Sequence, residues 1–338
     1  MSVTRRMALS SLLAAPALIG RRARATTRTL KISHQFPGGT IDQGDFRDRL
    51  VRRFAAEVQR RTDGELGFEV YPGSSLMKTV TQFSALRRGA LDLTVYPLAY
   101  AGGEMVEVNI GLMPCLVTTY EQGMAWKEKP VGRELTNVLD QRGVRILTWI
   151  WQAGGVASRG SAIVQPDDVR GVKVRGGSHE MDLMLKAAGG VISTLPSNEI
   201  YAAMQTGALD AAVTSSTSLI SFRLEEFSKA LTTGRTGSFW FMLEPLLISK
   251  LVYDSLTPMQ QKAIDEVGME QEAFAMEAAK QDDEDLAGIY AKVDVVAQTM
   301  DAAAIDKWKE LAQATAWRDF AGRNVSCALL LKLAELVP

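Results

Sequence analysis

Hydrophobic and polar positions in the first third of the chain follow two periods. A period of two, typical of half-buried strands, covers residues 29–35, 66–70 and 91–95. Between these segments the apolar residues recur on one helical face, at Phe46, Leu50, Val51, Phe54 and Val58 and again at Val80, Phe83 and Leu86. Gly64 and Gly89 follow the two helices, where a left-handed C-cap is expected. Strand and helix therefore alternate as a βαβαβ unit, which predicts a parallel sheet.

A second βαβαβ unit is predicted between Gly171 and Ser216. It begins with a strand at Val172–Arg175, and two glycines and a serine lead into a helix. Arg175 therefore lies at the end of a strand, at the edge of an open parallel sheet where ligands collect. A guanidinium there can hold a carboxylate through two parallel hydrogen bonds. The alternative is an arginine on a solvated loop.

The two units share a sequence signature. Residues 83–95 and 201–213 align without a gap, so that an aromatic residue, an alanine, the run Gly-Ala-Leu-Asp and a valine coincide. One explanation is convergence on a common connection between a helix and a strand, and the one we favour is two similar lobes. We interpret Asp210, like Asp92, as a structural cap or turn residue. Two α/β lobes that face each other would enclose a cleft.

The rest of the chain predicts connections between the lobes and a helical tail. We expect a helix over 121–141, a strand over 144–151 and another apolar strand over 239–248. Thr257-Pro258-Met259-Gln260 is a capping box with proline at the first helical position, and it opens a long helix that we expect to reach about Lys292. The acidic run at 282–285 is interpreted as a solvated helix face. Helices over 303–320 and 326–336 are expected to complete the tail.

The first 25 residues have the pattern of a secretory signal peptide. A basic start is followed by the mostly apolar segment Met7–Gly20 and by Ala23-Arg24-Ala25, an A-x-A type of cleavage site. Arg5-Arg6 resembles a twin-arginine signal, and a Sec signal with two arginines is the alternative. Cleavage near Ala25 would remove five arginines and change the net charge from −1 to −6. We therefore expect export to the periplasm and no binding of nucleic acid.

Composition and motifs argue against an enzyme. With 338 residues the chain is long enough for two domains, each with a core of its own. The sequence has no nucleophile elbow, phosphate loop, zinc-binding helix motif or dinucleotide fingerprint. Its two histidines, His34 and His179, are far apart, and no cluster has the spacing of metal ligands. Cys115 and Cys327 lie in apolar surroundings, which favours two separate buried thiols over a disulfide. We expect no catalysis, no cofactor and no metal.

The motifs in this order resemble those of the periplasmic solute-binding subunits of TRAP transporters, the DctP-like family. The resemblance covers nearly all of the chain after the signal peptide and rests on Phe68-Glu-Val-Tyr-Pro-Gly73, Gly89-Ala-Leu-Asp92, the run from Pro166 to Arg175, the run from Leu195 to Tyr201 with Gln205-Thr-Gly207 and Asp210, and Leu256-Thr-Pro258. It implies a periplasmic binding protein-like α/β fold, with two domains around a ligand cleft and a long helix spanning both. Domain I would comprise 28–151 plus 240–279, and domain II 152–239 plus 280–338.

The resemblance also implies a function. Such receptors bind mostly organic and sugar acids, Arg175 matches the arginine that holds the carboxylate, and the ligand passes to membrane permease subunits. A receptor that presents its ligand to a sensor kinase or chemoreceptor is an alternative, and a periplasmic enzyme acting on an acid is another.

The sequence departs from the family at several pocket positions. Many members have a further arginine just after the first crossing strand, where this chain has Gly154. The common Gly-Gln-Glu-Asn after the last aspartate is replaced by Ala211-Ala-Val-Thr214, and the aromatic residue after the Leu-Pro pair is replaced by Ser197. The candidate ligand-binding residues are hydroxyl, amide and aromatic side chains around the arginine: Arg175, Gln152, Trp151, Thr214, Ser215, Phe36, Tyr96, Ser197, Phe239 and Trp240.

Overall fold

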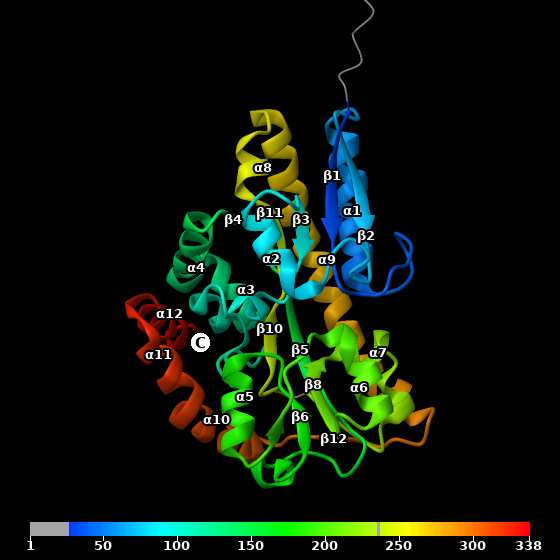
Figure 1. Cartoon of the computed structure of the whole chain (residues 1–338), viewed down its shortest axis with the longest axis vertical. Coiled ribbons are helices and arrows are strands. Elements are labelled where there is room, and N and C mark those ends of the chain that lie inside the picture. Colours follow the sequence, from blue (N-terminus) through cyan, green and yellow to red (C-terminus); the bar gives the residue numbers. More distant parts are fainter. Residues whose placement is uncertain (1–26, 235–236) are drawn as a thin grey trace, which may run out of the picture.

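Two β-sheets form the cores of two lobes. The computed structural model describes residues 27–234 and 237–338, and the predicted signal peptide lies outside them. The first sheet has the strand order β2-β1-β3-β11-β4, and the second has the order β12-β9-β5-β8-β6-β7, with β10 paired to β5. The lobes follow one another along the long axis of the molecule (Figure 1). The expected α/β fold with two domains is confirmed.

The strands of each sheet come from separate parts of the chain. Those of the first sheet are β1 (Arg28–Ser33), β2 (Leu66–Tyr71), β3 (Leu93–Val95), β4 (Val144–Thr148) and β11 (Leu246–Ser249). Those of the second are β5 (Trp151–Ser158), β6 (Lys173–Arg175), β7 (Val191–Ile192), β8 (Ala211–Ser215), β9 (Ala230–Thr233), β10 (Phe241–Leu243) and β12 (Ala297–Thr299). In each sheet the three strands of the predicted βαβαβ unit pair in parallel.

Helices cover both sheets. Those that accompany the first sheet are α1 (Phe46–Arg61), α2 (Thr79–Arg87), α3 (Tyr120–Ala125), α4 (Pro130–Gln141) and α8 (Lys250–Asp254), with the short 3-10 segments η1 (Leu98–Ala101) and η2 (Val106–Leu112). Those that follow the first crossing are α5 (His179–Ala187), α6 (Ile200–Thr206), α7 (Ser216–Ser221), α10 (Ala302–Ala312), α11 (Arg318–Arg323) and α12 (Val325–Glu335). The last of these, α12, packs on α4 and η2, so the tail reaches back to the first lobe.

Two chain crossings connect the lobes. The predicted strand over 144–151 is broken at Trp149-Ile150, between β4 and β5, and the predicted strand over 239–248 is broken at Glu244-Pro245, between β10 and β11. Each chain segment changes sheet at its break. Glu244 N donates to Ile150 O over 2.8 Å, so the two crossings lie side by side.

One predicted helix is wrong in its extent. The segment 121–141 is two helices, α3 and α4, separated by a 3-10 turn at Trp126–Glu128. Pro130 is the first residue of α4, and Lys129 before it has an extended backbone, with φ −94° and ψ 164°. A proline disfavours helical geometry in the residue before it, which explains the interruption.

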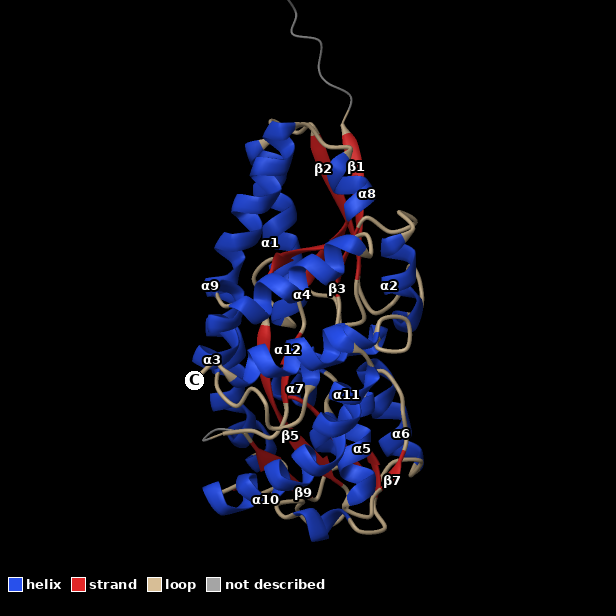
Figure 2. Cartoon of the chain, turned by 90° about the vertical axis from the view of Figure 1, so that its left-hand side faces the viewer, coloured by secondary structure: helices blue, strands red, loops and turns tan. Residues whose placement is uncertain are grey.

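The long helix α9 (Pro258–Ala291) confirms its predicted capping box and extent. Thr257 and Gln260 bond to each other's backbone, and the helix ends at Lys292 as its C-cap. It packs on α1 and β4 as well as on α7 and β5, so it joins both lobes (Figure 2). Within the described ranges no helix has the length and apolar character to cross a membrane.

The repeated signature has the same structure in both lobes. Gly89 and Gly207 end α2 and α6 with φ of +70° and +76°, the left-handed region that favours glycine. Asp92 Oδ2 then accepts from Lys31 N in β1 at 2.7 Å, and Asp210 Oδ2 accepts from Lys173 N in β6 at 3.1 Å. Each aspartate therefore fixes the strand beside it, and the structural interpretation of Asp210 is confirmed.

The acidic run on α9 is not a solvated face throughout. Glu284 and Asp285 are exposed, whereas Asp283 is buried and accepts from Tyr120 Oη at 2.7 Å. Asp282 accepts from Thr217 Oγ1 at 2.6 Å, and burial raises its pKa to about 6. The prediction is wrong for these two residues, because a helix that lies between two lobes has more than one buried side.

Candidate functional site

Arg175 is a buried side chain at the carboxyl end of β6. It is 1% exposed, which excludes the solvated loop. Its Nε donates to Leu195 O at 3.0 Å and its Nη1 to Val213 O at 2.9 Å, both in the second lobe. Its Nη2 donates to Tyr100 Oη at 2.5 Å, and Tyr100 belongs to η1 beside the first sheet. Arg175 therefore lies where the lobes meet.

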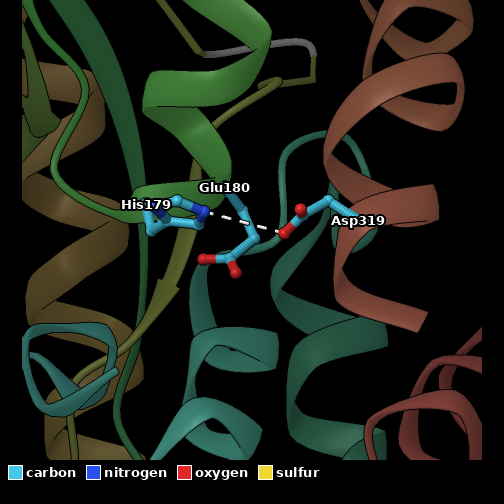
Figure 3. Close-up of side chains that lie close together, drawn as sticks. All are labelled: His179, Glu180 and Asp319. Atoms are coloured by element: carbon cyan, nitrogen blue, oxygen red, sulfur yellow. Dashed lines mark ion pairs between the residues drawn. The ribbon is translucent and has the colours of Figure 1, made fainter. Parts of the chain in front are cut away.

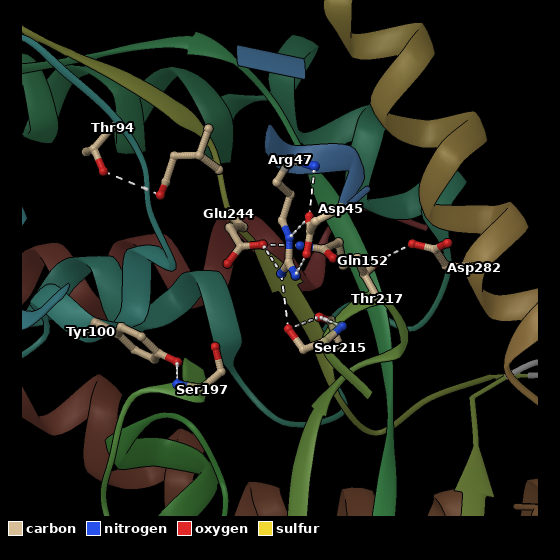
Figure 4. Close-up of polar contacts among 12 residues, drawn as sticks. Asp45, Arg47, Thr94, Tyr100, Gln152, Ser197, Ser215, Thr217, Glu244 and Asp282 are labelled. Carbon is tan, nitrogen blue, oxygen red and sulfur yellow. Dashed lines mark hydrogen bonds and ion pairs between the residues drawn. The ribbon is translucent and has the colours of Figure 1, made fainter. Parts of the chain in front are cut away.

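Tyr100 carries a contact between the lobes through a single hydroxyl. Besides the bond from Arg175, Oη accepts from Ser197 N at 3.0 Å (Figure 4). Ser197 follows the Leu195-Pro196 turn in the second lobe and is buried. One phenol thus joins the arginine and the turn that encloses it.

A glycine next to Arg175 leaves room for its guanidinium. A Cβ built at Gly177, where φ is +98°, would lie 2.6 Å from Arg175 Nη1. A side chain at this position would therefore displace the arginine, and the left-handed backbone also favours glycine.

A second buried arginine, Arg47, lies at the start of α1. Its Nε and Nη2 donate to the two carboxylate oxygens of Asp45 at 2.8 and 2.6 Å. Its Nη1 donates to Glu244 Oε2 at 3.0 Å and to Ser218 Oγ at 3.1 Å, so it reaches both the chain crossing and α7 of the second lobe (Figure 4). Burial lowers the pKa of Arg47, but the two carboxylates outweigh it, and the pKa is raised. Sequence reasoning missed this residue, and the only signal was Asp45 as a helix N-cap two residues before it.

Glu244 lies at the second crossing and faces Gln152 at the first. Gln152 Nε2 donates to Glu244 Oε2, the same oxygen that Arg47 binds. Burial raises the pKa of Glu244 to about 7, although Arg47 opposes the shift. Glu244 Oε1 and Gln152 Oε1 are buried and have no hydrogen-bond partner within the described ranges.

The ends of β1 and β3 bring further polar groups to the same region. Tyr96 N donates to Pro245 O at 3.2 Å, directly after Glu244, and the Tyr96 ring lies edge-on to Tyr100 at 6.0 Å between centroids. Phe36 lies beneath the Arg47 guanidinium at 3.6 Å. Tyr96 Oη and both amide atoms of Gln35 are buried without a partner among the residues that the structure describes.

The predicted hydroxyl residues follow β8 into α7. Ser215 is the N-cap of α7, since its Oγ accepts from Ser218 N at 3.1 Å and also bonds to Ser218 Oγ at 2.9 Å. Ser218 Oγ in turn accepts the hydrogen bond from Arg47, so Ser215 contacts Arg47 only through Ser218. Thr214 is buried one residue earlier, beside Gly155 of β5.

The predicted aromatic residues do not all lie in this region. Trp240 Nε1 donates to Gly176 O at 3.1 Å, next to Arg175. Trp151 instead packs edge-on to Trp126 at 5.1 Å, because its side chain points to the opposite face of the strand from Gln152. Phe239 stacks on Trp308 of the tail at 5.1 Å. The structure therefore places Trp151 and Phe239 in the cores of the lobes.

Two hollows lie beside the buried groups. One, of about 700 Å³, lies between the start of α1 and the helices α7 and α9, and Asp45, Thr217 and Asp282 are among its lining residues. The other, of about 270 Å³, is lined by Tyr100, Gly177 and Leu195 among others. The first hollow therefore borders Asp45, which pairs with Arg47. The second borders Tyr100 and Leu195, which bond to Arg175.

One group of side chains has the composition of a cation site. His179, Glu180 and Asp319 offer ligand atoms that lie within 4.8 Å of one another (Figure 3). However, Arg323 Nη2 lies 2.6 Å from His179 Nε2 and 2.7 Å from Asp319 Oδ2. A guanidinium already balances these groups, so the arrangement is that of an ion-pair cluster.

Both cysteines are free and buried, as expected from their surroundings. Burial raises the pKa of each thiol to about 12. Neither is therefore a reactive thiolate.

Two α/β lobes, two adjacent crossings and buried polar groups between the lobes define a two-domain solute-binding protein. The family model described as "Bacterial extracellular solute-binding protein, family 7" (DctP) matches residues 42–323. The chain belongs to this family. Its members are receptors, which confirms the expected class and gives no support to the enzyme and sensor alternatives.

Close relatives have the same architecture. A solute-binding protein of Albidiferax ferrireducens is 59% identical over 333 residues and covers 98% of each chain. The crystal structure of a TRAP periplasmic solute-binding protein from Rhodoferax ferrireducens, with bound malonate, has a TM-score of 0.90 at 60% identity, covering 91% of this chain and 98% of that one. A Bordetella pertussis extracytoplasmic solute receptor that binds pyroglutamic acid has a TM-score of 0.81 at 17% identity, covering 91% and 99%, and shows the shared fold.

Proposed function

We propose that this chain is the periplasmic receptor of a TRAP transporter, which binds an organic or sugar acid by its carboxylate and delivers it to membrane permease subunits. The observation that carries the proposal is the bonding of Arg175. Its guanidinium is buried between the lobes, yet it donates to two backbone carbonyls and a phenol and to no carboxylate among the described residues. A buried charge is stabilised by an opposite charge, and a ligand carboxylate would supply one.

Asp182 is the acid that most directly competes for this role. It experiences the charge of Arg175, but its oxygens accept from Gly176 N at 3.2 Å and Thr194 Oγ1 at 2.9 Å. Burial raises its pKa, and within the described ranges neither of its oxygens bonds to Arg175. The guanidinium therefore remains available to a ligand.

The ligands bound by relatives support the class of solute. Solved structures of related receptors contain malonate, β-D-galacturonate, D-glucuronate, orotic acid and succinate. These compounds differ in size and shape, and all carry a carboxylate. A single arginine anchor in this chain would be compatible with acids of such different shape.

The other predicted residues fall into two groups in this proposal. The first group lies around the crossings and the ends of the strands and would line or support the pocket. It comprises Gln152, Thr214, Ser215, Phe36, Tyr96, Ser197 and Trp240. Trp151 and Phe239 would act only through the packing of the lobe cores. Cleavage near Ala25 would place the mature receptor in the periplasm, and N-terminal sequencing of the exported protein checks this.

A thermal-shift screen against organic, aromatic and sugar acids tests the proposal. A ligand present at about 100 times its dissociation constant adds about 2.7 kcal/mol to the free energy of unfolding. We expect at least one acid to stabilise the protein and its uncharged amide analogue to fail. If no acid in a broad panel raises the melting temperature, or if the amide acts equally, the carboxylate anchor is refuted.

A further inference from the structure

Four buried polar side chains at the lobe junction have atoms without a partner. They are Gln35, Tyr96, Gln152 and Glu244, each 1% exposed or less. Both amide atoms of Gln35, the hydroxyl of Tyr96 and one oxygen each of Gln152 and Glu244 lack a hydrogen bond within 27–234 and 237–338. Unpaired buried polar groups are costly, so several of them in one region call for a partner, and a ligand can supply it.

These groups belong to one region, because contacts connect the elements that carry them. Tyr96 N bonds to Pro245 O, and Gln152 bonds to the adjacent Glu244. Strands β1 and β3 pair at Ser33 and Thr94, so that Gln35 and Tyr96 each follow two residues later on neighbouring parallel strands. All four therefore gather where the strand ends of the first lobe meet the crossings.

The charge of this region differs from that around Arg175. Arg47 is the cation here, and it already pairs with both Asp45 and Glu244. Its positive charge is therefore cancelled, and Glu244 retains one oxygen that can accept a further hydrogen bond. By contrast, Arg175 bonds to no acid among the described residues, and Tyr100 and Tyr96 lie between the two regions.

We propose that Glu244 and Gln152 form a subsite for the end of the ligand opposite its carboxylate, and that they select a hydrogen-bond donor there over a second carboxylate. This proposal rests on the proposed function. The ligand class is then a monocarboxylate whose far end carries a hydroxyl, an amide N–H or an ammonium group. The free oxygens of Glu244 and Gln152 accept from such a donor, whereas a second carboxylate offers no proton and is repelled by an ionised Glu244.

Matched pairs of acids test this preference. Malonate, succinate and glutarate are compared with 3-hydroxypropionate, 4-hydroxybutyrate and 5-hydroxyvalerate, so that each pair differs only in a terminal carboxylate or hydroxymethyl group. Calorimetry is performed at pH 8, above the pKa of about 7 to which burial raises Glu244. We expect the hydroxy acid to bind about tenfold more tightly or better in the pair whose length fits.

The variant Glu244→Gln locates the preference. It keeps the shape of the side chain and removes the charge, and Arg47 retains Asp45 as its partner. We expect the difference within the fitting pair to fall to about threefold or less. Glu180→Gln is the matched control, because Glu180 is equally buried, its pKa is also raised to about 7 by burial, and its oxygen accepts from Asn109 outside this region. The control is expected to keep the wild-type preference.

The outcomes separate this proposal from the proposed function. If a dicarboxylate binds wild type as tightly as its hydroxy acid in every pair, and binding still depends on Arg175, the subsite is refuted and the carboxylate receptor stands. An unchanged preference in Glu244→Gln also refutes it. If no acid of either kind binds, both proposals fail. The wild-type comparison requires no variant, so it remains decisive even if a substitution impairs folding.

Discussion

Trp240 occupies the space in front of Gly154. A Cβ built at residue 154 would lie 2.3 Å from Cε3 of Trp240 and 2.4 Å from Thr214 O. The indole bonds through Nε1 to Gly176 O, so it fills the region between the first crossing strand and the strand end that carries Arg175. In many relatives the position near Gly154 is expected to hold an arginine. Here a neutral ring fills that space, next to the strand end that carries Arg175.

Gly154→Ala is expected to destabilise the protein and weaken ligand binding. The new methyl group cannot be accommodated unless both Trp240 and the backbone at Thr214 move, and overpacking of this kind costs about 1–3 kcal/mol. Chemical denaturation measures the loss. Gly160→Ala is the control, because a Cβ at that residue would have its nearest neighbour, Ser158 Oγ, 3.9 Å away. Equal stability of the two variants would show that the position of Trp240 does not require a glycine at residue 154.

Arg175→Ala is expected to weaken binding of the acid found by screening by a factor of roughly 100 or more. Removing one partner of a buried ion pair costs about 3–5 kcal/mol. Arg175→Lys keeps the charge but not the planar fork, so its loss should be smaller and still clear. Calorimetry measures both. Arg170→Ala is the control, since that side chain is 73% exposed.

Arg175→Ala should also lower the free energy of unfolding. Leu195 O and Val213 O each accept a hydrogen bond from Arg175 and would be left without this donor. We expect the free energy of unfolding to fall by about 1–3 kcal/mol, as measured in denaturant. Binding of the acid within a few-fold of wild type would place the carboxylate anchor elsewhere.

Tyr100→Phe is expected to favour an open arrangement of the lobes. The substitution removes the oxygen that accepts from both Arg175 Nη2 and Ser197 N. In wild type, adding ligand should reduce the radius of gyration measured by X-ray scattering, because closure brings the lobes together. In the variant, a higher ligand concentration should be needed for the same reduction. Tyr71→Phe removes an exposed hydroxyl bonded to Glu69 and should behave as wild type. A wild-type scattering curve that does not change at saturation would argue against closure.

Stability without ligand is expected to fall as the pH rises from about 5 to 7.5. Burial raises the pKa of Glu244 and of Glu180 to about 7, above the value of about 4.3 for an unfolded chain. The folded state therefore binds more protons than the unfolded state in this window, and stability declines until both groups are ionised. Denaturation at pH 5.5 and 8 measures the decline. Glu244→Gln and Glu180→Gln should each reduce it, and a pH-independent difference between each variant and wild type would contradict the assignment.

Much of the fold could be predicted because it depends on local chemistry. The run Gly-Ala-Leu-Asp at 89–92 and 207–210 specifies a left-handed helix end, a buried strand and an aspartate that binds the neighbouring strand. Thr257 and Gln260 similarly specify the start of α9. These features act within a few residues, so their pattern is visible in the sequence. Pro130 was equally visible, and its effect on Lys129 would have corrected the single helix expected over 121–141.

The candidate site could be predicted only in part. Arg175 was identifiable because it ends a strand in a parallel unit. Trp151 and Gln152 are adjacent in sequence, and only the direction of β5 decides that the amide faces Glu244 while the indole faces Trp126. Phe239 is an aromatic residue of the kind that lines ligand pockets, yet Trp308 of the tail helix α10 stacks on it.

The sequence by itself determined the two similar lobes, the long capped helix and the arginine at the strand end, because each depends on the periodicity and turn chemistry of neighbouring residues. Only the tertiary structure decided which buried charges meet. Arg47 and Glu244 are 197 positions apart, and Arg175 and Tyr100 are 75 apart. No local pattern specifies such pairs, since they form where distant parts of the chain meet at the crossings and between the lobes. In the proposed function, the meeting of these groups would set the charge and hydrogen-bonding capacity of the pocket.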